Sequence, residues 1–369
     1  MRTLTLFIAF LVLLFGCQDE KDREDSLVSM PEPTEDFSFE IDTIKLMTPG
    51  TSPAFPYLVW SQDYSDRGLF TGLDMKQHTL YFLDTKKMEY QSSLKLYEDG
   101  PNEITPLMVG GFYYHSPDSI FVLQNIPNRL MMIDREGERE LFIELKKVFK
   151  GDPVFEGLNA YSMYYWNGIY YMNDKLYFEL IREDYTRRDN KYPVIGYYDL
   201  NTEEFKALDI QFPEVMKDAP ESYDIFPNIR YYKEFIYINY SYSADLYIYD
   251  LEGNIINEIA GHNRFRESEP YNPVNKKTKS EHYAENSAYD AVEPFENGNY
   301  FIQAGKGPEP PDPEKEIYEF TIVYNSDFSK FRVIDHRGRP FTFGGKYFYY
   351  PIPQAETGYQ LLERYRVVE

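Results

Sequence analysis

The sequence predicts an all-β protein, a six-bladed β-propeller in which the N-terminal strand closes the last blade. Aromatic residues make up 18% of the chain, and large flat side chains favour pleated, half-buried surfaces. Short apolar runs joined by polar turns recur along the chain. The stretch 118–145 shows this plan most clearly, as the predicted strands DSIFVLQ, RLMMID and RELFIEL with turns at NIPN and REGE.

The first residues predict an export signal peptide over residues 1–16. One basic residue, Arg2, precedes an apolar run of about half the ~20 residues that a membrane-spanning helix needs. The segment LFGC ending at Cys17 resembles the lipobox of bacterial lipoproteins. That resemblance implies that Cys17 becomes the lipid-bearing first residue of the mature chain. As Cys17 is the only cysteine, we expect no disulfide within the chain.

Residues 17–36 are charged, carry proline and contain few large apolar residues, which predicts a flexible acidic tether. The acidic cluster Asp19, Glu20 and Asp22 resembles the surface-export signal of Bacteroidetes lipoproteins. We therefore expect an outer-membrane lipoprotein, on the periplasmic face or the cell surface, with the membrane as a partner through the lipid on Cys17. Several acyl chains would anchor it stably, at ~0.8 kcal/mol for each buried methylene.

Residues 37–369 are predicted to form one domain of five complete four-stranded units and one truncated unit. The segment 37–46, FSFEIDTIKL, alternates apolar and polar residues but has no hairpin partner beside it in the sequence. The units are expected to consist of strands at 56–60, 68–74, 79–84 and 88–97; 106–115, 118–124, 129–134 and 139–145; 160–173, 175–181, 194–199 and 203–212; 223–232, 234–240, 245–250 and 254–260; 287–295, 299–305, 317–325 and 330–335; 340–344, 345–351 and 358–369.

The third strand of each complete unit ends in an acidic or amide residue. These residues are Asp84, Asp134, Asp199, Asp250 and Asn325. An oxygen at this position can accept hydrogen bonds from the backbone of the following turn, so the repeated residue type is explained by structure alone.

The sixth unit lacks an outer strand, and the segment 37–46 can supply it. Pairing the two ends of the chain would close the ring and protect the edge strands that an open array exposes. A pair of β-sandwiches is the alternative, and the shared strand-turn-strand pattern of the units favours the propeller.

The chain also resembles a known group of proteins. The lipobox, the phrases DSIFVL and MMIDREG, and the Gly-Pro stretches EDGPNEI and AGKGPEP are similar to those of uncharacterised six-bladed propeller lipoproteins of Bacteroidetes, relatives of NHL-type and TolB-like propellers. The resemblance implies the propeller fold and places no catalytic residue.

Several functions are disfavoured by charge and by motif. A formal charge of −23 repels nucleic acid and anionic lipid, so no nucleic-acid partner is expected. The chain has no phosphate-binding glycine motif, no zinc-binding His spacing, no EF-hand pattern and no GxSxG serine. We therefore predict neither a metal nor a cofactor. Paired carboxylates for glycoside chemistry stay open, because only their spatial separation would identify a pair among 61 acidic residues.

Ligand-binding candidates come from two places. In a propeller the first strand of each blade lines the central channel, and there we single out Tyr114, His115, Tyr165, Trp166, Arg230 and Tyr232. The long polar connection 260–283 adds Arg264 and Arg266 beside a lysine cluster, which could face an acidic partner.

The leading hypothesis from the sequence is a lipid-anchored, non-enzymatic propeller that binds a protein or a glycan. The alternative is a propeller hydrolase or lyase that acts on a carbohydrate. A third possibility is a structural subunit of an envelope assembly, which would expose an apolar patch.

Overall fold

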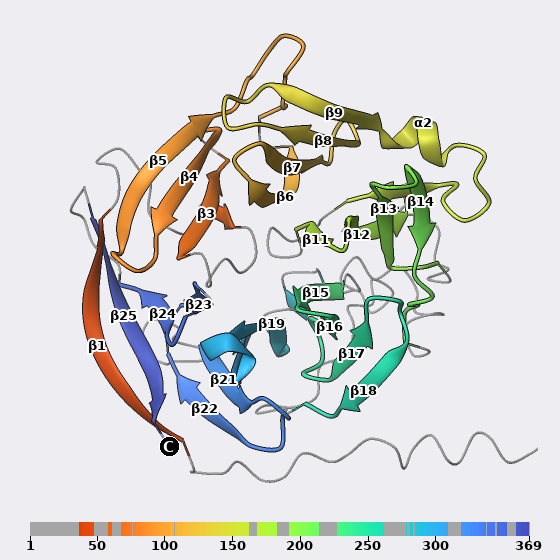
Figure 1. Cartoon of the computed structure of the whole chain (residues 1–369). Coiled ribbons are helices and arrows are strands. Elements are labelled where there is room, and N and C mark those ends of the chain that lie inside the picture. Colours follow the sequence, from red (N-terminus) through yellow and green to blue (C-terminus); the bar gives the residue numbers. More distant parts are fainter. Residues whose placement is uncertain are drawn as a thin grey trace, which may run out of the picture.

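The protein is all-β, and Figure 1 shows its computed structural model. The structure describes residues 37–47, 58–60, 68–75, 77–106, 108–161, 168–182, 192–213, 227–261, 278, 281–282, 285–308, 319–336, 338–343, 345–352 and 359–368. The predicted signal peptide 1–16, the tether 17–36 and Cys17 lie outside these residues. Within them, no helix is both long and apolar enough to cross a membrane.

The described strands form five sheets. We divide the eight-stranded sheet between β5 and β1, which gives six units, numbered in chain order. Unit 1 contains β2 (Leu58–Trp60), β3 (Leu69–Asp74), β4 (Thr79–Asp84) and β5 (Glu89–Lys95). Unit 2 contains β6 (Val109–Ser116), β7 (Ser119–Gln124), β8 (Arg129–Ile133) and β9 (Arg139–Glu144). Unit 3 contains β10 (Leu158–Ala160), β11 (Tyr170–Met172), β12 (Lys175–Arg182), β13 (Ile195–Asp199) and β14 (Glu204–Ala207).

Unit 4 contains β15 (Pro227–Tyr232), β16 (Phe235–Tyr240), β17 (Leu246–Asp250) and β18 (Ile255–Ile259). Unit 5 contains β19 (Ala288–Phe295), β20 (Tyr300–Lys306), β21 (Glu319–Asn325) and β22 (Phe331–Asp335). Unit 6 contains β23 (Phe341–Thr342), β24 (Phe348–Pro351), β25 (Tyr359–Val368) and, as its outer strand, β1 (Ser38–Met47). Units 6 and 1 form one continuous sheet, because Met47 at the end of β1 pairs with Glu89 of β5.

The units lie side by side around a common centre, and the labelled strands β6, β11, β15, β19 and β23 lie toward it in their units (Figure 1). Within a unit, successive strands are antiparallel. The hairpins that join first to second strands therefore lie at one end of the ring, which we call the hairpin end. The connections from the outer strand of one unit to the inner strand of the next lie at the opposite end, which we call the crossover end.

The pairing of the N-terminal strand with the last unit, expected from the sequence, is confirmed. Strand β1 runs antiparallel to β25 in an unbroken register from Ser38↔Val368 to Met47↔Tyr359. Leu46 is buried under this pairing, and Arg364 of β25 binds the carboxylate of Asp42 through two nitrogens. The two ends of the described chain are therefore joined within one sheet.

The acidic or amide residue at the end of each third strand also has the predicted role. Oδ1 of Asp84 accepts the backbone N–H groups of Lys86 and Lys87, both at 2.9 Å. Oδ1 of Asp250 accepts those of Glu252 at 3.0 Å and Asn254 at 2.8 Å. Asp134, Asp199 and Asn325 bind their own turns in the same way.

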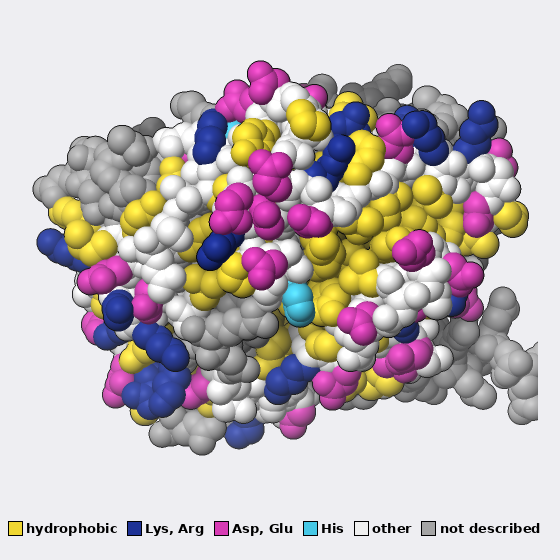
Figure 2. Space-filling view, turned by 45° about the horizontal axis from the view of Figure 1, so that its top comes forward, with side chains coloured by type: hydrophobic (Ala, Val, Ile, Leu, Met, Phe, Trp, Pro, Cys, Tyr) yellow, Lys and Arg dark blue, Asp and Glu magenta, His cyan; other side chains and the backbone are white. Residues whose placement is uncertain are grey.

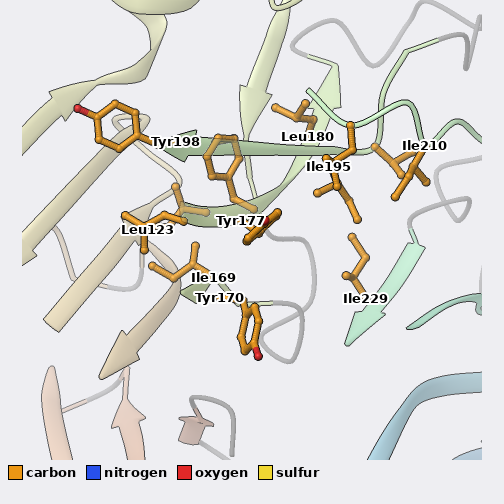
Figure 3. Packing of buried hydrophobic residues seen from close by; sticks show 14 of the residues in the cluster. Leu123, Ile169, Tyr170, Tyr177, Leu180, Ile195, Tyr198, Ile210 and Ile229 are labelled. Carbon is orange, nitrogen blue, oxygen red and sulfur yellow. The ribbon is translucent and has the colours of Figure 1, made fainter. Parts of the chain in front are cut away.

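Neighbouring units pack through aromatic and aliphatic side chains. The largest cluster joins units 2, 3 and 4, and Figure 3 shows part of it. The rings of Tyr170 and Tyr231 stack with centroids 5.0 Å apart, and Tyr177 lies 5.9 Å from Tyr231. These contacts fix the inner strands of units 3 and 4 against each other, and so hold β15 in place for the site described below.

The structure differs from the prediction just before unit 3 and in the inner strand of that unit. The predicted strand 139–145 gives way at Leu145 to a short helix, α2 (Leu145–Phe149), which buries Leu145 and Phe149 on one side, one helical turn apart. The predicted inner strand 160–173 is replaced by the separate strands β10 and β11, which both pair with β12. Gly110 and Gly111 lie inside β6, at a shift in its register with β7.

Gly111 is needed for close approach of two backbones. A Cβ atom at this position would lie 2.6 Å from the Cα atom of Gly168, which precedes β11. The pair of glycines therefore lets units 2 and 3 come together near the centre.

We expect replacement of Asp250 by Ala to lower the free energy of unfolding by about 1–2 kcal/mol, because two turn N–H groups lose their acceptor. Asp250→Asn keeps an acceptor oxygen, as Asn325 does in unit 5, and should cost much less. Urea unfolding of the three proteins measures this difference. Equal losses in the Ala and Asn variants would contradict the assigned role.

The difference in the free energy of unfolding between the wild type and Asp250→Ala should depend on pH. Burial acts to raise the pKa of Asp250, but hydrogen bonds from Asn254 and from the turn backbone lower it overall. The advantage of the wild type over Asp250→Ala is therefore complete at neutral pH and shrinks as the pH falls below the usual Asp range.

Candidate functional site

The inner strand β19 contains a bulge that places an acidic residue at the crossover end. Tyr289 pairs with Gly305, and the next paired residues are Val292 and Gln303, so Asp290 and Ala291 together face a single position of β20. Tyr289 and Val292 consequently pack into the same core cluster, although regular alternation would put them on opposite faces. Bulges commonly redirect a side chain next to a binding or catalytic site.

A buried ion pair joins the inner strands of units 4 and 5. Nη2 of Arg230 in β15 lies 2.7 Å from Oε1 of Glu293 in β19, and each side chain is only 6% exposed. Removing one member would leave an uncompensated buried charge, which typically costs about 3–5 kcal/mol. This pair therefore fixes the spacing of two inner strands and is shielded from a ligand.

A second ion pair lies nearer the crossover end and remains accessible. Oδ2 of Asp290 lies 3.1 Å from Nε of Arg339, with side-chain exposures of 32% and 23%. Arg339 lies between β22 and β23, so this pair joins units 5 and 6. Nε2 of Gln303 donates to the backbone oxygen of Asp290 at 3.3 Å, and Oε1 of Gln303 accepts from the Tyr324 hydroxyl at 3.0 Å. These two hydrogen bonds stabilise the bulge.

Burial raises the pKa of Asp290, and this effect outweighs the lowering by the neighbouring Arg339 guanidinium. The carboxylate of Glu293 raises it further, while Lys306 and Glu319 act in opposite directions. The carboxyl group is thus surrounded by protein although a third of its side chain reaches solvent. Asp290 therefore reaches solvent beside the Arg339 guanidinium, where it can accept hydrogen bonds.

Several buried polar atoms near the inner strands have unused hydrogen-bonding capacity. In the described part of the chain, the Tyr231 hydroxyl, Nδ2 of Asn239 and Oγ of Ser287 have no hydrogen-bond partner. Asn239 pairs in register with Asn228, whose Nδ2 donates to the Tyr289 backbone oxygen at 3.0 Å. Buried polar atoms of this kind usually bind an internal water or a ligand.

The arrangement offers groups that can recognise a polar ligand. Among the described residues, no group of three or more His, Cys, Asp or Glu side chains could hold a metal ion. The site supplies a cation and a carboxyl group, while Glu293, the second carboxylate of β19, is engaged by Arg230. A polar ligand could therefore bind at Asp290 and Arg339.

The predicted binding residue Arg230 lies on the neighbouring strand β15, in the buried pair with Glu293 that is shielded from a ligand. Tyr114 lies in the core against Phe82, with ring centroids 5.4 Å apart, and Tyr232 lies in the core between units 4 and 5. His115 lies at the hairpin end, with its ring 4.3 Å from that of Tyr171. The remaining candidates lie outside the described residues; they are Tyr165, Trp166, Arg264 and Arg266.

Sequence reasoning missed Asp290, Glu293 and Arg339. Two acidic residues three positions apart within the apolar strand AYDAVEPF were a usable signal, because charged side chains in an inner strand need partners. In a regular strand, residues three positions apart point to opposite faces, so the spacing of Asp290 and Glu293 is consistent with a bulge.

The raised pKa of Asp290 should appear in the pH dependence of stability. The folded protein binds the proton of the Asp290 carboxyl group more tightly than the unfolded chain does. The contribution of this protonation to the free energy of unfolding is therefore complete below the unfolded pKa of about 3.9, and it is lost as the pH rises through the folded pKa. Wild type should therefore lose stability relative to Asp290→Asn as the pH rises above about 4. Urea unfolding across this range measures the difference, and a constant difference or the opposite slope would contradict the assignment.

The chain matches a family of unknown function over most of its length. The model of the family described as "Domain of unknown function (DUF4221)" matches residues 34–293. No curated protein matches the chain.

Two solved structures from Bacteroides are similar in fold. A DUF4221 family member from Bacteroides vulgatus has 14% sequence identity and a TM-score of 0.70, over 90% of this chain and 99% of that one. A putative exported protein from Bacteroides fragilis has 10% identity and a TM-score of 0.59, over 93% of this chain and 100% of that one.

Proposed function

The chain belongs to the DUF4221 family, and from this membership and the geometry around Asp290 we propose that it is a lipid-anchored envelope protein that binds a protein or a glycan without transforming it. The accessible Asp290–Arg339 pair at the crossover end carries the proposal. A partly exposed guanidinium and carboxyl group side by side offer both donors and acceptors to a polar ligand.

The proposed architecture is a six-bladed β-propeller related to NHL-type and TolB-like propellers. Six units around one centre (Figure 1) and the β1–β25 pairing support it. In such a ring, the inner strands would carry Arg230 and Asp290 along the central channel.

The proposed anchor is the lipid on Cys17, which places the protein in the outer membrane on its periplasmic face or at the cell surface. The LFGC segment supports it, as does the fold similarity to an exported protein from Bacteroides fragilis. Cys17→Ser should move the protein from the membrane fraction to the soluble fraction of Bacteroides cells, where Western blotting detects it. Retention of the variant in the outer-membrane fraction would contradict lipid anchoring.

A protein partner is favoured by the surface of units 2 and 3. Figure 2 shows hydrophobic side chains gathered into a band across one face, between acidic and basic side chains. The large hydrophobic residues that are exposed include Ile126, Val148 and Val154. Exposed apolar areas of this kind often mark interaction surfaces, and they equally fit the structural-subunit hypothesis.

The enzymatic alternative has one observation in its favour. Two carboxyl groups lie on one strand, and burial raises the pKa of Asp290, as a general acid requires. Glu293, however, is 6% exposed and held by Arg230, so it cannot reach a substrate or activate a water molecule. Binding is therefore the better-supported function.

Binding should depend on Arg339. The probes are a glycan array and detergent-solubilised outer-membrane proteins, each tested with the full-length protein. We expect Arg339→Ala to weaken binding to the recognised probe by about tenfold or more, as expected for loss of a charged hydrogen bond. The matched control, Arg135→Ala, removes an arginine that is 68% exposed and, among the described residues, pairs with its neighbour Glu136 at the hairpin end.

Equal binding by the wild type and Arg339→Ala would contradict a site at Asp290 and Arg339. Release of new reducing ends from any bound glycan by the wild type would overturn the non-enzymatic proposal in favour of a hydrolase or lyase.

A further inference from the structure

A second site lies at the hairpin end, between unit 5 and the strands that close the ring. A cavity of about 720 Å³ opens there, within the usual 300–1,000 Å³ range of small-molecule sites. Its walls come from the β19–β20 hairpin, from the β21–β22 turn, and from Phe37 and Val367 beside the β1–β25 pairing. Asp290 and Arg339 do not line it, so this cavity is separate from the crossover-end site.

Phe37 and Tyr300 are the aromatic residues of the cavity lining, and we call them the base of the cavity. Phe37 and Tyr300 meet edge to face with ring centroids 5.7 Å apart, and both are buried. Phe295 stacks beneath Tyr300 at 5.5 Å. A ligand can therefore rest an apolar face against a preformed base, which reduces the ordering cost of binding.

The hairpin that forms one wall is also held in a defined shape. Glu296 and Asn297 have left-handed backbone conformations, with φ of 50° and 59°, which side-chain-bearing residues rarely adopt. The Glu296 N–H donates to the Gly345 backbone oxygen at 2.6 Å, which ties the hairpin to unit 6. Glu296 and Asn299 therefore line the cavity from a fixed turn.

The polar groups of the wall are mixed in kind and balanced in charge. The side chains of Glu296, Asn299 and Ser326 make no hydrogen bond to any residue that the structure describes. Asn325 and Lys330 complete the polar lining. One carboxylate and one ammonium group cancel in charge, while the amide and hydroxyl groups both donate and accept.

We propose that this cavity binds a neutral saccharide, of about one or two rings. A sugar ring has an apolar face that can pack against the base, and hydroxyl groups that can exchange hydrogen bonds with the wall. A neutral sugar also suits a lining in which one carboxylate and one ammonium group cancel. An anionic ligand would meet a protein with a net charge of −23 and only one lysine in this lining. This inference rests on one part of the proposed function, that the protein binds its ligand without transforming it.

Binding at this cavity would also stabilise the closure of the ring. Phe37 precedes β1 and Val367 belongs to β25, so a bound sugar would bridge unit 5 and both closing strands. A ligand that binds the folded state alone raises stability according to its concentration relative to Kd. A rise in Tm is therefore expected on saturation.

The test uses the full-length protein and four neutral disaccharides: maltose, cellobiose, lactose and N,N′-diacetylchitobiose, with glucuronic acid as the anionic probe. Isothermal titration calorimetry gives Kd, and thermal unfolding gives Tm. The variant Asn299→Ala/Ser326→Ala removes two exposed polar side chains of the wall. The matched control Asn257→Ala removes an exposed amide on β18 in unit 4.

We expect at least one neutral disaccharide to bind with a Kd of about 1 mM or tighter and to raise Tm. The double variant should weaken binding about tenfold or more, whereas Asn257→Ala and Arg339→Ala should bind as the wild type does. Absence of binding by all four disaccharides, or tighter binding of glucuronic acid, would overturn the proposal.

The variants also separate this inference from the proposed function. Sugar binding lost in Arg339→Ala but kept in the double variant would assign the sugar to the crossover end, which supports the proposed function and overturns the second site. Loss in the double variant alone supports the second site, whatever the outcome for Asp290 and Arg339.

Discussion

The antiparallel pairing of β1 with β25 is the constraint on which the rest of the structure depends. Ten consecutive residue pairs, from Ser38↔Val368 to Met47↔Tyr359, join the two ends of the described chain. Without β1, unit 6 would present β25 as an open edge, and edge strands readily pair with other chains. The pairing also links unit 6 to unit 1 through Met47 and Glu89, so it holds the last unit between its two neighbours.

Both proposed sites depend on this closure. Asp290 of unit 5 meets Arg339, which lies between units 5 and 6, and the hairpin-end cavity is lined by Phe37 and Val367 from the closing strands. The buried Arg230–Glu293 pair adds a second fixed spacing, between units 4 and 5. Each proposed site, at the crossover end and at the hairpin end, is therefore formed by residues of more than one unit. The contacts between the units set the positions of these residues.

The sequence predicted the strands and their grouping because both rest on local signals. Alternating apolar residues and turn residues such as Asp84 and Asp250 act within a few positions of the chain. The replacement of the inner strand of unit 3 by β10 and β11, and the helix at Leu145, escaped prediction because tertiary packing overrides local preference there. The site escaped for a related reason: Asp290 meets Arg339 only after folding, and the β19 bulge that redirects Asp290 is read from the pairing register.

Native-state hydrogen exchange of the β1 and β25 amides tests the central claim, closure of the ring by β1, most directly. If closure holds the ring together, these amides should exchange only through global unfolding, with the same opening free energy as the amides of central strands such as β12 and β16. Exchange of β1 through a local opening of much lower free energy, while β12 and β16 stay protected, would contradict the claim, because the ring would then persist without its closing strand.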